Sequence, residues 1–216
     1  MGLIKLALTA SALYYAGVHG YVMYHLRTAA FRVVRPRLGS HVTETEKKRI
    51  IQSRQPLVRA VLSLYQAKPS SDHLSFYAPR ATFTDPFARL LGRREITTAF
   101  CLLPKALEKA ETLGYTVEHA EDWLAISLVQ RYTVRYVPFS FELPSVIHLT
   151  LTERTEKGRE TVGKGRETIL THSEFWYGKA FVDESNMRTL GVGRMAEKIR
   201  RFHGWLVTRY ELNPPR

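Results

Sequence analysis

Two side chains near the end of the chain, His172 and Glu174, could move a proton to or from a substrate. They are two residues apart, so in a β-strand both point to the same face, together with Trp176. Burial beside an aromatic ring can tune the pKa of such a pair for general acid–base catalysis. Asp85 is a third candidate, because it closes an apolar segment directly before Pro86. These residues would suit general acid–base chemistry.

Each candidate also has a structural interpretation, and the pattern favours it. The other face of the same strand carries the more apolar set, which includes Phe175 and Tyr177. We expect that face to fill the core, with His172 and Glu174 turned towards solvent or another subunit. An aspartate before a proline is typical of a turn that anchors the following loop, so Asp85 is expected to be a turn residue.

A metal site would need His119, His148 and His172 to converge from separate strands. No close ligand spacing of the kind His-x-Glu-x-x-His occurs in the sequence. We therefore predict no metal and no cofactor.

The elements that position these residues follow from periodicity and punctuation. Thr43 and Glu46 form a capping box at the start of a helix, and Pro56 is expected to begin a second helix. A short helix is expected to follow Ser70 and to include Tyr77. The remaining segments are expected to be a strand at 81–86, a helix at 93–110, strands at 115–123, 125–137, 145–155 and 168–177, and a helix at 192–210. This order predicts an α+β fold in which a curved antiparallel sheet packs on N-terminal helices.

Two stretches of the sequence resemble a known family. The stretch HLSFYAPRATFTDPFARLLGRREITTAF resembles the opening of nuclear transport factor 2-like, SnoaL-like domains, and THSEFWYGKA is similar to their last strand. The resemblance covers about residues 55–180. It implies a cone whose curved sheet encloses a pocket, in a family of isomerases, dehydratases, polyketide cyclases, transport adaptors and non-catalytic members. The matching residues are Tyr77, Phe83, Asp85, Pro86, Gly92, Ile96, Phe100, Glu174 and Trp176.

The implied pocket would be lined by aromatic side chains and would hold a small apolar ligand or nothing. An enzyme would need an open cavity with converging polar groups. Side chains that fill this space would contradict the enzyme hypothesis. The expected lining residues are Tyr77, Phe83, Phe100, Trp123 and Trp176.

The N-terminal segment has no full charge from Leu6 to Leu26. A helix needs ~20 such residues to cross a bilayer, so this segment is long enough. Lys5 precedes it and a cluster of arginines that begins at Arg27 follows it. We predict a membrane anchor at residues 3–26, with the domain facing the mitochondrial matrix or the cytosol and a mitochondrial location favoured. A cleaved mitochondrial presequence and a helix lying on the membrane surface remain alternatives.

The net charge of +12 is concentrated at the two ends of the chain. Residues 1–42 carry +5 and residues 190–216 carry +4, which leaves +3 for residues 43–189. Nucleic-acid binding is therefore not expected of the middle domain. Residues 1–42 are the predicted anchor and linker, residues 43–189 the α+β domain, and residues 190–216 a basic amphipathic helix. That helix, with Phe202 and Trp205, would either lie on an anionic membrane or pack on the sheet.

The sequence as a whole predicts a membrane-anchored, non-catalytic binding or assembly module with a protein complex as partner. The first alternative is a small SnoaL-like isomerase or lyase that uses Asp85, His172 or Glu174 on a hydrophobic substrate. The second alternative is a membrane adaptor that contacts the ribosome or another complex.

Overall fold

The computed structural model describes residues 43–135, 140–152 and 167–176, together with residues 198, 200–202, 204 and 205 near the C-terminus. The predicted membrane anchor and most of the repeated KGRET segment lie outside the described residues. Within the described part of the chain, no helix is both long enough and apolar enough to cross a membrane.

Helix α2 (Glu44–Tyr65) is continuous, so the predicted break at Pro56 is wrong. Its N-terminus is as predicted, since the side chain of Thr43 accepts a hydrogen bond from the backbone N–H of Glu46. A proline inside a helix costs about 3 kcal/mol. Burial of an apolar side chain returns about 1.5–3 kcal/mol each, and α2 buries several. The buried stripe, which includes Leu57, Val61 and Leu64, therefore outweighs the proline.

In the part of the chain that the structure describes, six strands form one open sheet in the order β2-β1-β6-β5-β4-β3. Neighbouring strands are antiparallel except β1 and β6, which pair in parallel, so the expectation of a purely antiparallel sheet is corrected. A parallel pair needs a long connection, and here most of the domain lies between the two strands. The strands are β1 (Tyr77–Thr84), β2 (Arg89–Leu91), β3 (Leu107–His119), β4 (Trp123–Val134), β5 (Ser140–Leu151) and β6 (Ile169–Trp176).

Several element boundaries differ from the prediction. The short helix α3 (Ser71–Leu74) ends before Tyr77, which instead begins β1. Helix α4 (Gly92–Ala106) stops at Ala106, and β3 begins at once, although the following residues favour a helix by composition. Pairing along β4 fixes this segment as a strand, starting with Leu107 opposite Val134. Gly92 starts α4 at φ +82°, a left-handed conformation that favours glycine.

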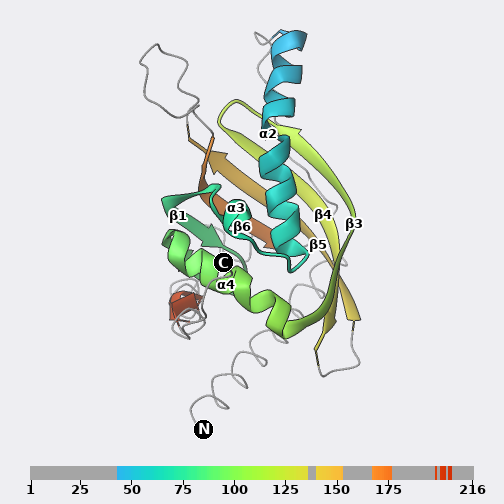
Figure 1. The fold of residues 1–216 in the computed structure, drawn as a ribbon, viewed down its shortest axis with the longest axis vertical. Coiled ribbons are helices and arrows are strands. Elements are labelled where there is room, and N and C mark those ends of the chain that lie inside the picture. The colour runs from blue at the N-terminus through green and yellow to red at the C-terminus, as the bar shows by residue number, and fades with distance from the viewer. Residues whose placement is uncertain are drawn as a thin grey trace, which may run out of the picture.

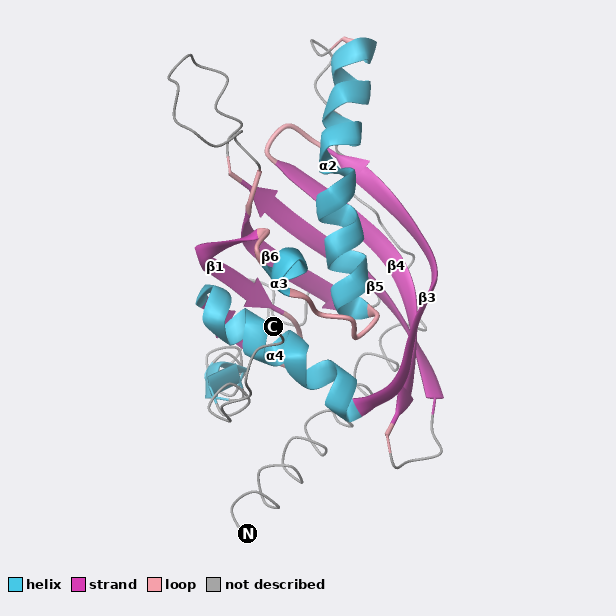
Figure 2. Ribbon diagram, in the orientation of Figure 1, coloured by secondary structure: helices cyan, strands magenta, loops and turns pink. Residues whose placement is uncertain are grey.

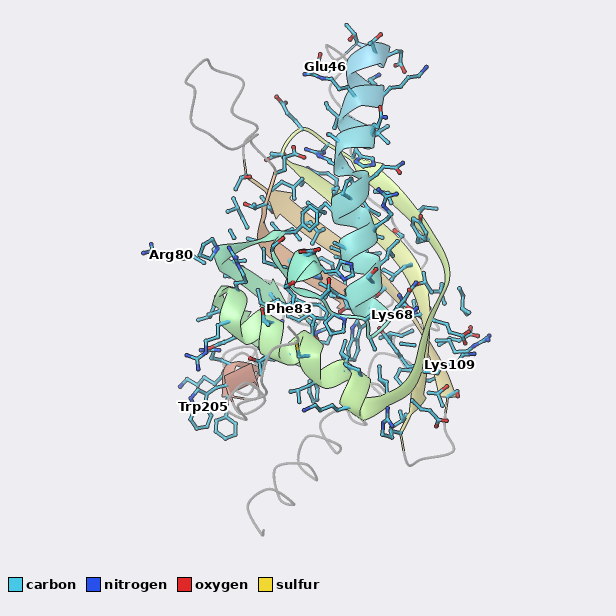
Figure 3. All side chains as sticks on the ribbon, in the orientation of Figure 1. Glu46, Lys68, Arg80, Phe83, Lys109 and Trp205 are labelled. Carbon is cyan, nitrogen blue, oxygen red and sulfur yellow. The ribbon has the colours of Figure 1, made fainter. Side chains whose placement is uncertain are left out.

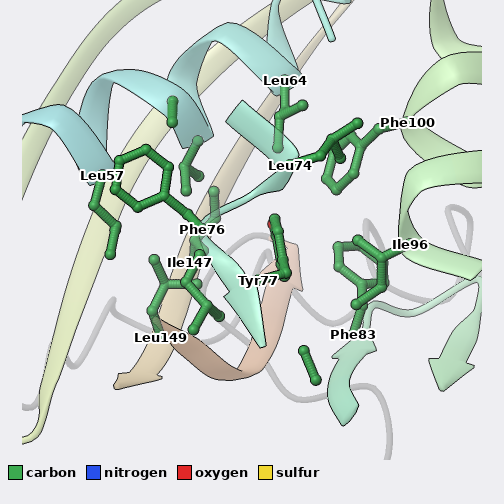
Figure 4. Close-up of a cluster of buried hydrophobic side chains, with 14 of the residues drawn as sticks. Leu57, Leu64, Leu74, Phe76, Tyr77, Phe83, Ile96, Phe100, Ile147 and Leu149 are labelled. Atoms are coloured by element: carbon green, nitrogen blue, oxygen red, sulfur yellow. The ribbon is translucent and has the colours of Figure 1, made fainter. Parts of the chain in front are cut away.

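The helices cover one face of the sheet, and the core lies between the two layers (Figures 1 and 2). Helix α2 crosses that face, and α4 packs beside β1. In the core, Leu57 and Phe76 lie near Ile147 and Leu149, while Phe83 lies near Ile96 and Phe100 (Figure 4). The predicted α+β architecture, with a curved sheet on N-terminal helices, is confirmed.

Candidate functional site

His172 and Glu174 point into the core from the middle of β6, so the expectation that they face outward is wrong. His172 is 0% exposed, and Glu174 is buried as well. The polar face of β6 is tolerated inside because other elements supply hydrogen-bond partners, and buried polar groups with partners avoid most of the desolvation cost. Those partners are Tyr65 on α2 and Tyr77 on β1.

A chain of hydrogen bonds joins the four side chains. The Oη of Tyr77 lies 2.8 Å from Nδ1 of His172, and the Oη of Tyr65 lies 3.0 Å from Nε2. Tyr65 donates its hydroxyl proton to Oε2 of Glu174 at 2.7 Å. While Tyr65 donates to Oε2, its single proton is used, so it accepts from His172, whose Nε2 then carries the hydrogen. Nδ1 in turn accepts from Tyr77, and both ring nitrogens are occupied.

Aromatic rings surround His172 on several sides. It stacks between Tyr65 and Tyr77, with ring centroids 6.0 Å and 5.9 Å away. Phe83 lies 4.7 Å and Phe100 6.4 Å from the same ring. Burial in this apolar setting lowers the pKa of His172 to about 3, because a charged imidazolium would lose its hydration. His172 is therefore neutral at ordinary pH.

Glu174 is shifted in the opposite direction. Burial and the nearby charge of Asp85 raise its pKa to about 8. The hydrogen bond from Tyr65 and the neighbouring polar groups of Ser145 and Trp176 lower the pKa again, but less strongly. Near neutral pH the protonated form of Glu174 is thus favoured, and the interior avoids a bare negative charge.

Asp85 anchors the turn after β1, as the sequence predicts. Its Oδ1 accepts hydrogen bonds from the backbone N–H groups of Phe87, at 2.7 Å, and Ala88. Burial raises the pKa of Asp85 to about 6, although these two donors and the charge of Arg200 pull it down. Asp85 is thus a turn residue that also acts electrostatically on Glu174. The structure brings all three candidate acid–base residues into one region.

Four of the five predicted pocket residues lie in two clusters of buried side chains. Tyr77, Phe83 and Phe100 gather around His172 within one core cluster. Trp176 belongs to a second cluster, with Tyr132 and Leu143. Side chains therefore occupy the space around His172.

Trp123 is wrongly predicted as a pocket residue. Its neighbour Leu124 points inward and is fully buried, so strand alternation turns Trp123 to the outer face. There its ring lies 4.6 Å from that of His148.

The three histidines considered for a metal do not meet. His172 is inside, the ring of His148 lies tilted against Trp123, and His119 lies near Arg54 and Glu167. Among the residues that the structure describes, no three His, Cys, Asp or Glu side chains gather as metal ligands.

Sequence reasoning missed Tyr65 and Ser145 as members of this site. By its spacing, Tyr65 is one more residue of the apolar stripe of α2. Its hydroxyl was the available signal, because a buried tyrosine needs a hydrogen-bond partner. That partner lies 107 positions away in the sequence, and periodicity cannot identify a contact at that distance.

The architecture and the opening motif together identify the type of fold. An open, curved sheet carries helices on one face, and the motif residues Tyr77, Phe83 and Phe100 meet inside it. This arrangement agrees with the nuclear transport factor 2-like fold that the opening motif resembles. No family model matches the chain, and no curated protein sequence matches it.

Solved structures with a nuclear transport factor 2-like or related fold are similar to this chain at low identity. A nuclear transport factor 2-like protein from Anabaena variabilis is 8% identical, with a TM-score of 0.48, over 64% of this chain and 95% of that one. A hypothetical protein with a ketosteroid isomerase-like fold from Catenulispora acidiphila, in complex with trimethylamine, is 17% identical. Its TM-score is 0.42, over 56% of this chain and 85% of that one. A hexachlorocyclohexane dehydrochlorinase is 11% identical, with a TM-score of 0.47, over 62% and 89%.

Proposed function

We propose that this chain is a non-catalytic binding or assembly module that works at a membrane, with residues 3–26 as its anchor. The supporting observation is the state of His172. A general base must present a free nitrogen to its substrate, within about 3 Å. Both nitrogens of His172 are hydrogen-bonded to tyrosines, and its ring is 0% exposed. The polar side chains of the interior are therefore hydrogen-bonded to one another.

The filled interior can be tested with a small apolar ligand such as benzene. We expect the wild-type protein to bind none, as judged by ligand-observed NMR. Replacing Phe100 with Ala removes a ring that contacts both Tyr65 and Phe83, and it should create a dry cavity. The Phe100→Ala variant should therefore bind benzene. Saturable binding by the wild type would contradict the filled interior.

The membrane anchor can be tested by carbonate extraction and protease protection of the tagged full-length chain. The wild type should stay with the membrane pellet and show a single protected orientation. A variant with Leu13→Lys and Val18→Lys interrupts the apolar run and should be extracted, because charges in the bilayer centre are costly. The matched Leu13→Ala and Val18→Ala variant should stay in the pellet. Complete extraction of the wild type would contradict the anchor.

A second candidate function is a small isomerase or lyase, and one observation favours it. The environments of Asp85 and Glu174 raise their pKa values to about 6 and about 8. Titratable groups whose pKa values differ in this way can divide acid and base roles. Glu174 would then donate a proton and Asp85 would accept one from a hydrophobic substrate.

This alternative predicts deuterium uptake from D2O at the α-carbon of a cyclic unsaturated ketone. Glu174→Gln and Asp85→Asn should each abolish the uptake. Glu142→Gln, on the exposed surface of β5, should not change it. A rate no faster than the buffer reaction would reject the enzyme and leave the binding module.

A further inference from the structure

The described part of the C-terminal helix shows its aromatic residues to solvent and its arginine to the domain. Residues 198, 200–202, 204 and 205 are helical. Arg200 and Gly204, four residues apart, are buried, whereas Phe202 is 59% and Trp205 38% exposed. The helix thus meets β2 through Gly204, while Phe202 lies on its exposed side.

Specific contacts of its inner side hold the helix in this orientation. Arg200 donates to the backbone oxygen of Asp85 at 2.5 Å. Arg201 makes two bonds to the carboxylate of Glu95, at 2.6 Å and 2.9 Å. Gly204 lies so close to β2 that a Cβ there would be 2.5 Å from the backbone oxygen of Arg89. The charged and small residues are needed for docking, so the aromatic rings must face away.

The exposed aromatic residues form a compact apolar feature. The rings of Phe202 and Trp205 stack at 5.7 Å. Leu91, which is 43% exposed, donates its backbone N–H to the same Glu95 carboxylate that holds Arg201, so it lies next to this ion pair. Figure 3 shows Trp205 on the outer side of the helix, away from the sheet.

The surroundings of this feature are strongly basic. The segments 89–95 and 198–205 contain six arginine or lysine residues and one acid, Glu95, for a net charge of +5. Glu95 is already paired with Arg201. Arg94 and Lys198 are exposed.

We propose that Leu91, Phe202 and Trp205 insert into the interface of an anionic bilayer while the neighbouring basic residues contact its headgroups. Tryptophan favours the membrane–water interface, and each basic residue near an anionic surface adds about 1 kcal/mol. A protein partner fits less well, because three apolar side chains cannot make the core of a standard interface of ~800 Å² per partner. The contact extends the proposed function and rests on the domain working at a membrane. It would attach the domain to the membrane at a second point, distant in sequence from the anchor.

Quenching of Trp205 by brominated lipid tests the contact directly. The full-length chain is reconstituted into phosphatidylcholine vesicles and into vesicles that also contain phosphatidylserine, each with and without brominated acyl chains. We expect quenching that requires phosphatidylserine and disappears in Trp205→Phe. The control variant Tyr115→Ala, which removes an exposed aromatic residue from β3, should be quenched like the wild type. Quenching that ignores phosphatidylserine, or that persists in Trp205→Phe, would overturn the proposal.

Flotation of the anchor-disrupted Leu13→Lys, Val18→Lys chain provides a second measurement. Its binding to phosphatidylserine vesicles should weaken about tenfold in the Phe202→Ala, Trp205→Ala background, which corresponds to about 1.4 kcal/mol. Failure of carbonate extraction to retain the wild type would count against the anchor alone. Unchanged flotation of the aromatic variant, or a Trp205 emission that shifts with protein concentration without lipid, would count against this contact. The latter result would indicate a second copy of the chain as the occupant.

Discussion

His172 remains neutral and fully bonded in the core because two tyrosine hydroxyls compensate for its lost hydration. Tyr77 donates a hydrogen bond to Nδ1, and Tyr65 accepts one from Nε2 and donates one to Glu174. The direction of each bond follows from the single proton that each hydroxyl carries. The arrangement makes Tyr77 the only donor to Nδ1 among the hydrogen bonds of the described residues.

Replacing Tyr77 with Phe should destabilise the protein by about 1–3 kcal/mol, because Nδ1 of a buried histidine loses its donor. Urea unfolding measures the change. Tyr115→Phe, at an exposed position of β3, is the matched control and should have no effect. In the wild type, ¹⁵N NMR of the ring should show hydrogen on Nε2. A Tyr77→Phe variant as stable as the wild type would contradict this role.

Glu174 should make the folded state less stable as pH rises. Its pKa is raised from 4.5 to about 8, so between these values the folded chain holds a proton that the unfolded chain has lost. Stability contributed by this group is then lost progressively from about pH 4.5 to about pH 8 and is constant above that. Asp85, raised from 3.8 to about 6, acts in the same direction over a lower range.

The variant Glu174→Gln should remove this loss and still accept the hydrogen bond from Tyr65. Between pH 6.5 and pH 9 the urea midpoint of the wild type should fall, while that of Glu174→Gln should stay nearly constant. His172, lowered from 6.5 to about 3, costs stability only as pH falls below 6.5, so it does not affect this window. Glu142→Gln, on the exposed surface, should follow the wild type. Parallel curves for Glu174→Gln and the wild type would show that Glu174 titrates normally.

At the scale of elements, α2 is fixed to the sheet by one buried arginine. Arg54 donates to the backbone oxygens of Ala120 and Glu121, at 2.5 Å and 2.6 Å, in the turn between β3 and β4. It also makes two 2.9 Å bonds to Glu167, just before β6. A planar guanidinium can satisfy several acceptors at once, which lysine cannot do. Arg54 thus connects α2 with the turn between β3 and β4 and with the segment just before β6.

Replacing Arg54 with Met should destabilise the fold by about 3–5 kcal/mol, because Glu167 and two backbone oxygens would lose their partner in a buried site. Arg59→Met, on the exposed side of the same helix, should change stability by less than about 0.5 kcal/mol. Thermal and urea unfolding of both variants would measure the difference. Equal effects of the two substitutions would mean that the buried hydrogen bonds of Arg54 do not stabilise the fold.

Element types were more predictable from the sequence than element boundaries. Caps and apolar spacing correctly predict the start of α2 at Thr43 and the strand-rich second half of the chain. They fail at residues 107–114, where helix-favouring residues form part of β3 because β4 pairs with them. The inward face of β6 was also unpredictable, since it depends on hydroxyl groups of α2 and β1. Long-range partners, not local propensity, decide both cases.

At the scale of the whole molecule, most of the net positive charge lies at the two ends of the chain, outside the range that contains His172 and Glu174. The middle range 43–189 carries only +3, while the two ends together carry +9. The folded domain is stabilised mainly by apolar burial and by short-range bonds such as those of Arg54 and His172. The proposed headgroup contact depends instead on exposed basic residues near Phe202 and Trp205, such as Arg94 and Lys198. The two sets of interactions should therefore respond differently to salt.

Raising the salt concentration from 0.1 M to 1 M shortens the Debye length from about 10 Å to about 3 Å. The domain's melting temperature, followed by near-ultraviolet circular dichroism, should then change little, because buried interactions are screened weakly. Membrane pelleting should also persist, because an anchor held by apolar burial does not depend on charge. Lipid quenching of Trp205, in contrast, should be lost with increasing salt and recover on dilution. Loss of pelleting together with quenching would mean that residues 3–26 do not anchor the chain. Quenching that survives at 1 M salt would mean that Trp205 contacts lipid without help from the surrounding basic residues.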